Sequence, residues 1–240
     1  MRIVVGITGA SGAIYGLRLL ERLRNRQGAE VHLVLTRSAE KTLFLETGRL
    51  AADVGKLADF WYPLEDIACR LASGSYPTDG MVIAPCSVHT MSAIANGISS
   101  NLLVRAADVT LKEKRKLILL VRESPLHLGH LRNMTSLSEM GAIIAPPIPG
   151  FYNHPQTVMD IVDHSIDRVL DLIGIPDTQV RRWEGAEKRV QEPGGPSQRP
   201  RWRLPFKERA APSAKKPPAT CWDRVLPFCH ANASKTSSAP

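Results

Sequence analysis

Residues 3–12, with the sequence Ile3-Val4-Val5-Gly6-Ile7-Thr8-Gly9-Ala10-Ser11-Gly12, decide the fold. The first five form a short uncharged run, which is typical of a strand buried on both faces of a sheet. A glycine-rich turn follows, and after it apolar residues recur at helical spacing, at Ile14, Leu17, Leu20 and Leu23. The sequence therefore predicts a strand that passes through a tight turn into a helix, with Ser11 placed to cap that helix.

The same alternation continues along the chain. Four more short apolar runs are flanked by turn residues: Val31–Leu35, Met81–Ala84, Leu117–Val121 and Ala142–Ala145. A last helical pattern runs from Val158 to Ile173. Strands that alternate with helices predict an α/β fold with a doubly wound parallel sheet, Rossmann-like or flavodoxin-like. Such sheets bind ligands beyond the carboxyl ends of their strands.

The composition is that of an ordinary globular protein, since 43% of the 240 residues are hydrophobic and 22% are charged. These values exclude a wholly disordered, collagen-like or coiled-coil chain. No stretch has the roughly 18 apolar residues that a membrane span needs, and the first residues do not resemble a secretory signal. We therefore expect a cytoplasmic protein without a membrane partner. The four cysteines form no Cys-x-x-Cys pair, which argues against a zinc knuckle.

The net charge of +8 lies mainly in the carboxyl-terminal segment. Residues 184–240 hold 11 Lys and Arg against 5 Asp and Glu, together with 9 of the 18 prolines. A segment so rich in proline and so poor in apolar residues cannot sustain helices or central strands. We therefore expect a folded domain over residues 1–183 and a basic, disordered tail over 184–240. A solvated extension is favoured over an arm that binds nucleic acid or acidic partners.

Two of the expected strand ends can hold an anion or a flavin. In the turn Thr8–Gly12, glycines let the backbone approach a ligand, and the helix start favours negative charge. The second strand ends in Thr36-Arg37, without the acidic residue that binds an adenosine ribose, so a mononucleotide is favoured over a dinucleotide. A tight turn without a ligand is the alternative. Residues 84–92 place further hydroxyls at the third strand end, where we expect Cys86 to be a buried apolar residue and His89 a polar contact. Ligand spacing predicts no metal site.

Cations and a carboxylate follow along the chain. Arg105 and Lys112 are about two helical turns apart, so both can lie on one helix face and bind an oxyanion. The fourth strand ends in Arg122-Glu123, a pair suited to binding and protonating a leaving group. A proline-rich loop then carries Tyr152, and Arg168 lies on the next helix. The alternatives are a solvated helix face for the cations and packing against the sheet for the loop.

Taken together, these motifs resemble the UbiX-type flavin prenyltransferases over residues 1–183. The motifs that match in order and spacing are Thr8-Gly9-Ala10-Ser11-Gly12, Ala84-Pro85-Cys86-Ser87, Arg105-Ala106-Ala107-Asp108, Leu111-Lys112-Glu113, Arg122-Glu123-Ser124-Pro125 and Pro149-Gly150-Phe151-Tyr152. The resemblance implies a metal-independent enzyme that joins the prenyl group of dimethylallyl monophosphate to reduced FMN, first at N5 and then at C6. It also implies a partner UbiD-type decarboxylase that uses prenylated FMN, and a homododecamer whose sites are completed by neighbouring subunits.

The resemblance further implies roles for individual residues. Glu123 and Lys112 would act on the leaving phosphate, and Ser11 with Glu46 would remove a proton during ring closure. The residues expected to contact FMN are Gly9, Ala10, Ser11, Thr36, Ser87, Val88, His89, Thr90 and Arg122. Those expected to bind the prenyl donor are Ser73, Arg105, Lys112, Glu123, Tyr152, Arg168 and Trp183.

Three departures from the family pattern leave alternatives open. Val88-His89 stands where the family often has Thr-Gly, Val121 stands where it often has Pro, and Ile67 stands where an aromatic residue would shield the donor. Trp183, or Trp61 with Tyr62, could take over that shielding. A non-catalytic FMN-binding carrier, or regulatory subunit of a decarboxylase system, is one alternative function. A flavoprotein decarboxylase acting on a peptidyl cysteine is another, although it would leave the phosphate-binding cations without a purpose.

Overall fold

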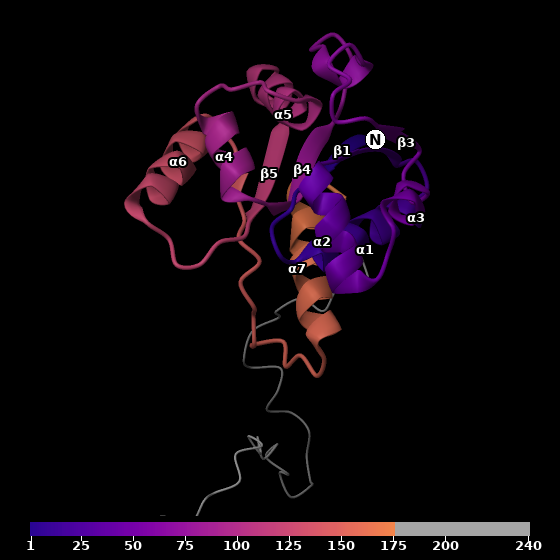
Figure 1. The fold of residues 1–240 in the computed structure, drawn as a ribbon. Helices are drawn as coiled ribbons and strands as arrows, with labels where there is room; N and C mark the ends of the chain where they lie inside the picture. The colour runs from indigo at the N-terminus through magenta and orange to yellow at the C-terminus, as the bar shows by residue number, and fades with distance from the viewer. Residues whose placement is uncertain (176–240) are drawn as a thin grey trace, which may run out of the picture. The chain divides into compact units, whose positions relative to one another are not determined.

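A computed structural model describes residues 1–175 of the chain, so Trp183 and the expected tail lie outside the described residues. The described part consists of parallel strands and connecting helices (Figure 1). In chain order these elements are β1 (Arg2–Ile7), α1 (Ala13–Arg24), β2 (Glu30–Leu35), α2 (Arg37–Thr47), α3 (Ala51–Gly55), β3 (Phe60–Tyr62), the 3-10 helix η1 (Arg70–Ala72), β4 (Gly80–Cys86), α4 (Val88–Ala95), α5 (Leu102–Lys112), β5 (Lys116–Val121), α6 (Leu128–Glu139), β6 (Ile143–Ile144) and α7 (Val158–Ile173).

The strands form one six-stranded sheet in the order β3-β2-β1-β4-β5-β6, and every pairing is parallel. The register places Ile3 opposite Val31 on one side and opposite Gly80 on the other. Connections from β1 lead outward to β2, whereas those from β4 lead outward to β5, so the order reverses between β1 and β4. This is the doubly wound fold that the alternation of strands and helices predicts, and the reversal opens a crevice at the carboxyl ends of β1 and β4.

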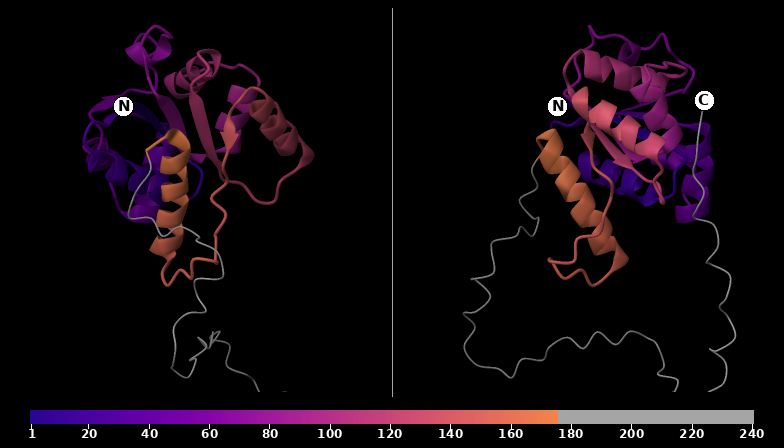
Figure 2. Two further views of the ribbon diagram at one scale, coloured as in Figure 1. Left: turned by 180° about the vertical axis from the view of Figure 1, so that it is seen from behind. Right: turned by 90° about the vertical axis from the view of Figure 1, so that its left-hand side faces the viewer.

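Each face of the sheet has its own core, because successive strand residues point to opposite sides. Ile3, Val5 and Ile7 pack with α1, α2 and α7, whereas Val4 packs with α4, α5 and α6. The two views of Figure 2 show α7, in orange, and α6, in pink, on different sides of the sheet. Helix α1 lies especially close: a Cβ added at Gly16 would stand 2.3 Å from the carbonyl oxygen of Ala84.

The sequence pattern predicts five of the six strands and does not reveal β3. This strand has only three residues at the edge of the sheet, and Phe60 and Trp61 are exposed, so no buried apolar run marks it. Contacts with β2 hold it in place. The imidazole of buried His32 stacks on Phe60, with ring centroids 5.1 Å apart, and its Nδ1 lies 2.9 Å from the hydroxyl of Tyr62. Among the described helices, none is long and apolar enough to cross a membrane.

Candidate active site

The turn between β1 and α1 is closed by a carboxylate from α2. The Oε2 atom of Glu46 accepts hydrogen bonds from the backbone N–H groups of Gly12 (2.9 Å) and Ala13 (2.8 Å). The expectation that Ser11 caps α1 is wrong: Gly12 is the N-cap residue, in the left-handed region with φ of 99°, and no side chain of the cap residue bonds to the helix. The negative charge that the helix start favours comes from Glu46 instead.

The same contacts keep Glu46 ionised. Burial alone would raise the pKa of its carboxyl, but hydrogen bonds from the Ser11 hydroxyl and from the backbone of Ala13 and Gly12 outweigh that effect. The positive charge of Arg122 acts in the same direction, and the net pKa of Glu46 lies below its ordinary value. The structure therefore brings Ser11 and Glu46 together as a hydrogen-bonded pair and places Arg122 close enough to influence it.

Helix α2 also packs directly on Gly9. The hydroxyl of Thr42 donates to the carbonyl oxygen of Gly9 (3.2 Å), and a Cβ added at Gly9 would stand 2.4 Å from the Cβ of Ser38. Thr36 caps α2 by accepting a hydrogen bond from the N–H of Ala39. Gly9 and Thr36, both expected to contact FMN, therefore lie against the same first turn of α2, and only glycine fits at position 9.

The turn after β4, the second place where we expect a flavin to bind, is hydrogen-bonded to the β1–α1 turn through Thr8. The buried Thr8 hydroxyl donates to the carbonyl oxygen of Pro85 (2.7 Å) and accepts from the N–H of Ser87 (2.9 Å). Ser87 caps α4 through the N–H of Thr90. The two turns that border the crevice are thus held in a fixed relation, as a shared flavin site requires. Thr8 belongs to a quoted motif, but the sequence did not reveal this bridging role.

The residues after β4 and β5 complete this edge of the sheet. The backbone N–H of Arg122 donates to the carbonyl oxygen of Cys86 (3.0 Å), and the next residue, Glu123, accepts from the N–H of Ser124 (3.0 Å). Cys86 is fully buried, and burial raises its pKa to about 12, so it is the apolar core residue that we expected. His89 is exposed.

A second group of expected donor-binding residues gathers around α5 and η1. Arg105 donates to the carbonyl oxygen of Ala72 (3.2 Å) and pairs with Asp108 (2.7 Å), while Lys112 pairs with Glu113. A Cβ added at Gly74 would stand 2.6 Å from Nζ of Lys112. Ser73 lies beside these cations, its hydroxyl 2.8 Å from that of Ser75.

This second group is separated from Glu123 within one chain. Lys112 ends α5, shortly before β5 begins at Lys116, whereas Glu123 follows the end of β5 at Val121. A strand of six residues spans about 20 Å. Lys112 therefore lies at the amino-terminal end of β5 and Glu123 at its carboxyl-terminal end. Within a single subunit the two side chains cannot act on one phosphate, as the resemblance implies that they do.

A third group lies on the loop before α7 and on α7 itself. The hydroxyl of Tyr152 lies 2.9 Å from Nε2 of His164, and the guanidinium of Arg168 lies 3.1 Å from the carboxylate of Asp171. Of the two expected donor ligands, Tyr152 thus contacts His164, and Arg168 lies four residues after this histidine on α7. No motif marks His164, because its role depends on where the loop folds back.

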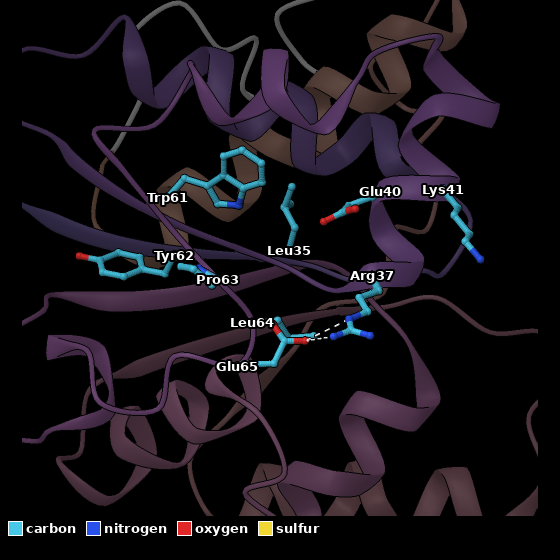
Figure 3. Close-up of a pocket in the computed structure, with 9 residues that line it drawn as sticks. All are labelled: Leu35, Arg37, Glu40, Lys41, Trp61, Tyr62, Pro63, Leu64 and Glu65. Atoms are coloured by element: carbon cyan, nitrogen blue, oxygen red, sulfur yellow. Dashed lines mark hydrogen bonds and ion pairs between the residues drawn. The ribbon is translucent and has the colours of Figure 1, made fainter.

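A cavity of about 600 Å³ lies at the carboxyl ends of β2 and β3, next to the start of α2. Arg37, directly after Thr36, pairs with Glu65 at 2.6 Å (Figure 3). The figure shows Arg37 turned toward Glu65, whereas Lys41 points away from Trp61. Trp61 and Tyr62 therefore line a space next to the expected FMN contact Thr36. The lining residues are Leu35, Arg37, Glu40, Lys41, Trp61, Tyr62, Pro63, Leu64 and Glu65.

Comparison with known proteins gives a consistent result. The Flavoprotein family model matches residues 1–170. "Flavin prenyltransferase UbiX" of Salmonella typhimurium is 53% identical over 188 residues, which is 77% of this chain and 99% of that protein. A dodecameric FMN-dependent UbiX-like decarboxylase from Escherichia coli O157:H7 superposes with a TM-score of 0.76 at 50% identity, covering 77% of this chain and 100% of that one. AnUbiX (PadA1), solved with FMN and dimethylallyl pyrophosphate, gives a TM-score of 0.75 at 43% identity, covering 77% and 98%.

Proposed function

The chain belongs to the UbiX-type flavin prenyltransferases of the flavoprotein family, and from this premise we propose that it transfers the dimethylallyl group of dimethylallyl monophosphate to N5 and then C6 of reduced FMN. In the first step the C–O bond to phosphate breaks and a C–N bond forms. N5 loses its proton in that step. In the second, the prenyl double bond gains a proton at one carbon, its other carbon forms a C–C bond to C6 that closes the fourth ring, and C6 loses a proton. The related AnUbiX structure holds the pyrophosphate form of the donor, so that form is the alternative substrate.

One observation carries this proposal: a hydrogen-bonded Ser11–Glu46 pair and an Arg122-Glu123 pair meet at the carboxyl edge of one sheet, and the charge of Arg122 reaches Glu46. The reaction needs a group that accepts the flavin proton and a group that protonates the leaving phosphate. Glu46, ionised and bonded to Ser11, supplies the first through the Ser11 hydroxyl. Glu123, half-buried at the end of β5, supplies the second.

The residues around the crevice fit FMN. Gly9 lets the β1–α1 turn pack directly on α2, Thr36 and Ser87 place hydroxyls at helix starts that favour a phosphate, and Thr90 lies in the first turn of α4. FMN supplies the nucleophilic N5 when it is reduced. We propose that these groups bind it, together with Arg122 and the remaining expected contacts Ala10, Val88 and His89.

Departure of the donor phosphate calls for cations around its oxygens. Arg105, Lys112 and Arg168 are the cations we assign to it, with Ser73 and Tyr152 as hydroxyl donors. Because Lys112 and Glu123 lie at opposite ends of β5 in one chain, we propose that neighbouring copies complete each site, as in a dodecamer like that of the E. coli relative. The product, prenylated FMN, would pass to a UbiD-type decarboxylase.

Release of inorganic phosphate tests this function. Under anaerobic conditions, the protein with dimethylallyl monophosphate should release phosphate with reduced FMN and not with oxidised FMN. Glu123→Gln should slow that release at least a hundredfold, since general acid catalysis contributes about 10²–10⁴, while FMN affinity stays unchanged. Phosphate release that ignores the state of the flavin would contradict the proposal, and none at all would favour a flavin carrier. Unchanged turnover in Glu123→Gln would show that Glu123 is not the acid that protonates the leaving phosphate.

A further inference from the structure

We propose that His164 is a positioning residue that orients the Tyr152 hydroxyl toward the phosphate of the prenyl donor. This inference rests on the proposed function, in which Tyr152 and Arg168 bind that phosphate. Neither the sequence motifs nor the family resemblance drew attention to His164. It is identified by its contacts alone, which join a loop residue to the middle of α7.

The contact between the two side chains is close and well defined. Nε2 of His164 lies 2.9 Å from Oη of Tyr152, a normal hydrogen-bond distance. The two rings meet edge to face, with centroids 5.5 Å apart and an angle of 80° between their planes. A hydrogen bond and a ring contact together restrict both the position and the rotation of the Tyr152 side chain, which otherwise lies on an exposed loop.

The backbone of the loop leaves room for this pair. A Cβ added at Gly150 would stand 3.2 Å from Cε1 of Tyr152 and 3.3 Å from Cε1 of His164. Both distances are shorter than ordinary carbon contacts, which lie near 3.5–4.0 Å. The absence of a side chain at position 150 therefore lets the loop fold onto both rings at once.

His164 also faces the second expected phosphate ligand. Arg168 follows it by four residues on α7, so the two side chains lie one above the other on the same helix face. Both line a cavity of about 120 Å³ beneath residues 145–148. The imidazole and the guanidinium thus border one small cavity, and the Tyr152 hydroxyl reaches the imidazole from the loop.

The direction of the hydrogen bond decides what Tyr152 can do. A phenolic hydroxyl has one proton to donate and can also accept. If Nε2 of His164 carries a proton and donates it to Oη, the proton of Tyr152 is directed to the phosphate oxygen. If Tyr152 instead donated to the imidazole, it could only accept, and it would repel the phosphate. The positioning role therefore requires the Nε2–H form of His164, since only this form makes Tyr152 a donor to the anion.

Donor binding to the full-length, FMN-loaded protein tests this assignment. With oxidised flavin there is no turnover, so the dissociation constant of dimethylallyl monophosphate can be measured by titration. Tyr152→Phe should weaken binding about tenfold, as expected for loss of a hydrogen bond to a charged group. His164→Ala and His164→Leu should weaken donor binding about five- to tenfold, because the Tyr152 hydroxyl would still bond to the phosphate but in a poorer geometry. His164→Gln, whose amide can still donate to Oη, should restore most of the affinity.

The control is Ser165→Ala. Ser165 lines the same cavity, but its hydroxyl donates to the carbonyl oxygen of Ile161 within α7, so its loss should leave donor affinity unchanged. In turnover, His164→Ala should raise the KM for the donor and leave kcat and FMN affinity near the wild-type values, which a general disturbance of α7 would not do.

The outcomes separate the two proposals. If Tyr152→Phe weakens donor binding but His164→Ala and His164→Leu do not, the positioning role is wrong and the proposed function stands. The same conclusion follows if His164→Gln binds as weakly as His164→Ala. If Tyr152→Phe binds the donor normally, the role of Tyr152 in the proposed function fails, and the inference fails with it. If the wild-type protein does not bind the donor, both are overturned.

Discussion

The carboxylate of Glu46 accepts hydrogen bonds at the start of α1, a capping role that the local sequence assigns to Ser11. Glu46 comes from another helix, 34 residues after Gly12, and accepts hydrogen bonds from the two amides at the start of α1. Motif spacing cannot reveal such a contact, because it depends on how α2 packs beside the turn. The burial of Cys86, in contrast, was expected, because no nearby base in the sequence marks it as a nucleophile. Sequence reasoning therefore finds residues whose role is local and misses those, like Glu46 as a cap and His164, whose role is tertiary.

Glu46→Gln should change how stability depends on pH. The folded protein lowers the pKa of Glu46, so it binds that proton more weakly than the unfolded chain does. The resulting stabilisation is complete above the ordinary carboxyl value of 4.5 and is lost as the pH falls through the lower folded value. We expect wild type to be more stable than Glu46→Gln at pH 7, with the difference shrinking as the pH falls below about 4.

Urea unfolding followed by circular dichroism between pH 7 and pH 3 measures this difference. Glu40→Gln is a matched control on the same helix, because neither a hydrogen bond nor an ion pair of its carboxylate is among the contacts that hold the turn. Its stability should follow the wild-type pH dependence. A Glu46→Gln defect of constant size across this range would contradict the ionised-cap account.

At the scale of elements, length and burial decide what could be predicted. The helices α1 and α7 have continuous apolar stripes, and β1, β2, β4 and β5 are nearly all buried, so the sequence pattern marks each of them. The edge strand β3 has no such pattern and depends on contacts with His32 from β2. The contact of α2 with the β1–α1 turn was also not predictable, although glycine at position 9 marks the place.

Gly9→Ala tests the contact between the turn and α2. The new Cβ would lie 2.4 Å from the Cβ of Ser38, so the turn or the helix must move. We expect FMN affinity, measured by flavin fluorescence titration, to fall at least tenfold. Ser38→Gly in the same chain removes that atom and should restore part of the affinity. Wild-type FMN binding by Gly9→Ala would show that the turn does not contact the flavin.

At the scale of the whole molecule, the alternation of strands and helices was enough to predict a doubly wound sheet and the edge where ligands bind. It could not show how the donor-binding residues come together, since spacing along the chain says nothing about which sheet edge a side chain reaches. The structure divides the donor-binding residues into three groups, with Lys112 and Glu123 at opposite ends of β5. A phosphate site that uses both therefore needs a second copy of the chain.

Mixing two inactive variants tests this division. Lys112→Ala and Glu123→Gln should each be nearly inactive alone. Co-expressed in equal amounts, they should recover activity, because about one quarter of the sites in a mixed oligomer would draw wild-type residues from both subunits. Ser11→Ala mixed with Glu46→Gln is the matched control. These two residues are bonded within one chain, so that mixture should not recover. Failure of the first mixture would contradict a phosphate site that takes Lys112 from one subunit and Glu123 from another.

If this protein attaches a prenyl group to FMN, the mass of the flavin must increase by that group. The purified protein is incubated anaerobically with reduced FMN and dimethylallyl monophosphate, and the flavin is extracted and analysed by mass spectrometry, with an active family member in parallel. We predict a gain of one C5H8 unit in wild type and a much slower gain in Glu123→Gln. Bound FMN of unchanged mass, while the parallel enzyme is active, would contradict the account and identify a flavin carrier instead.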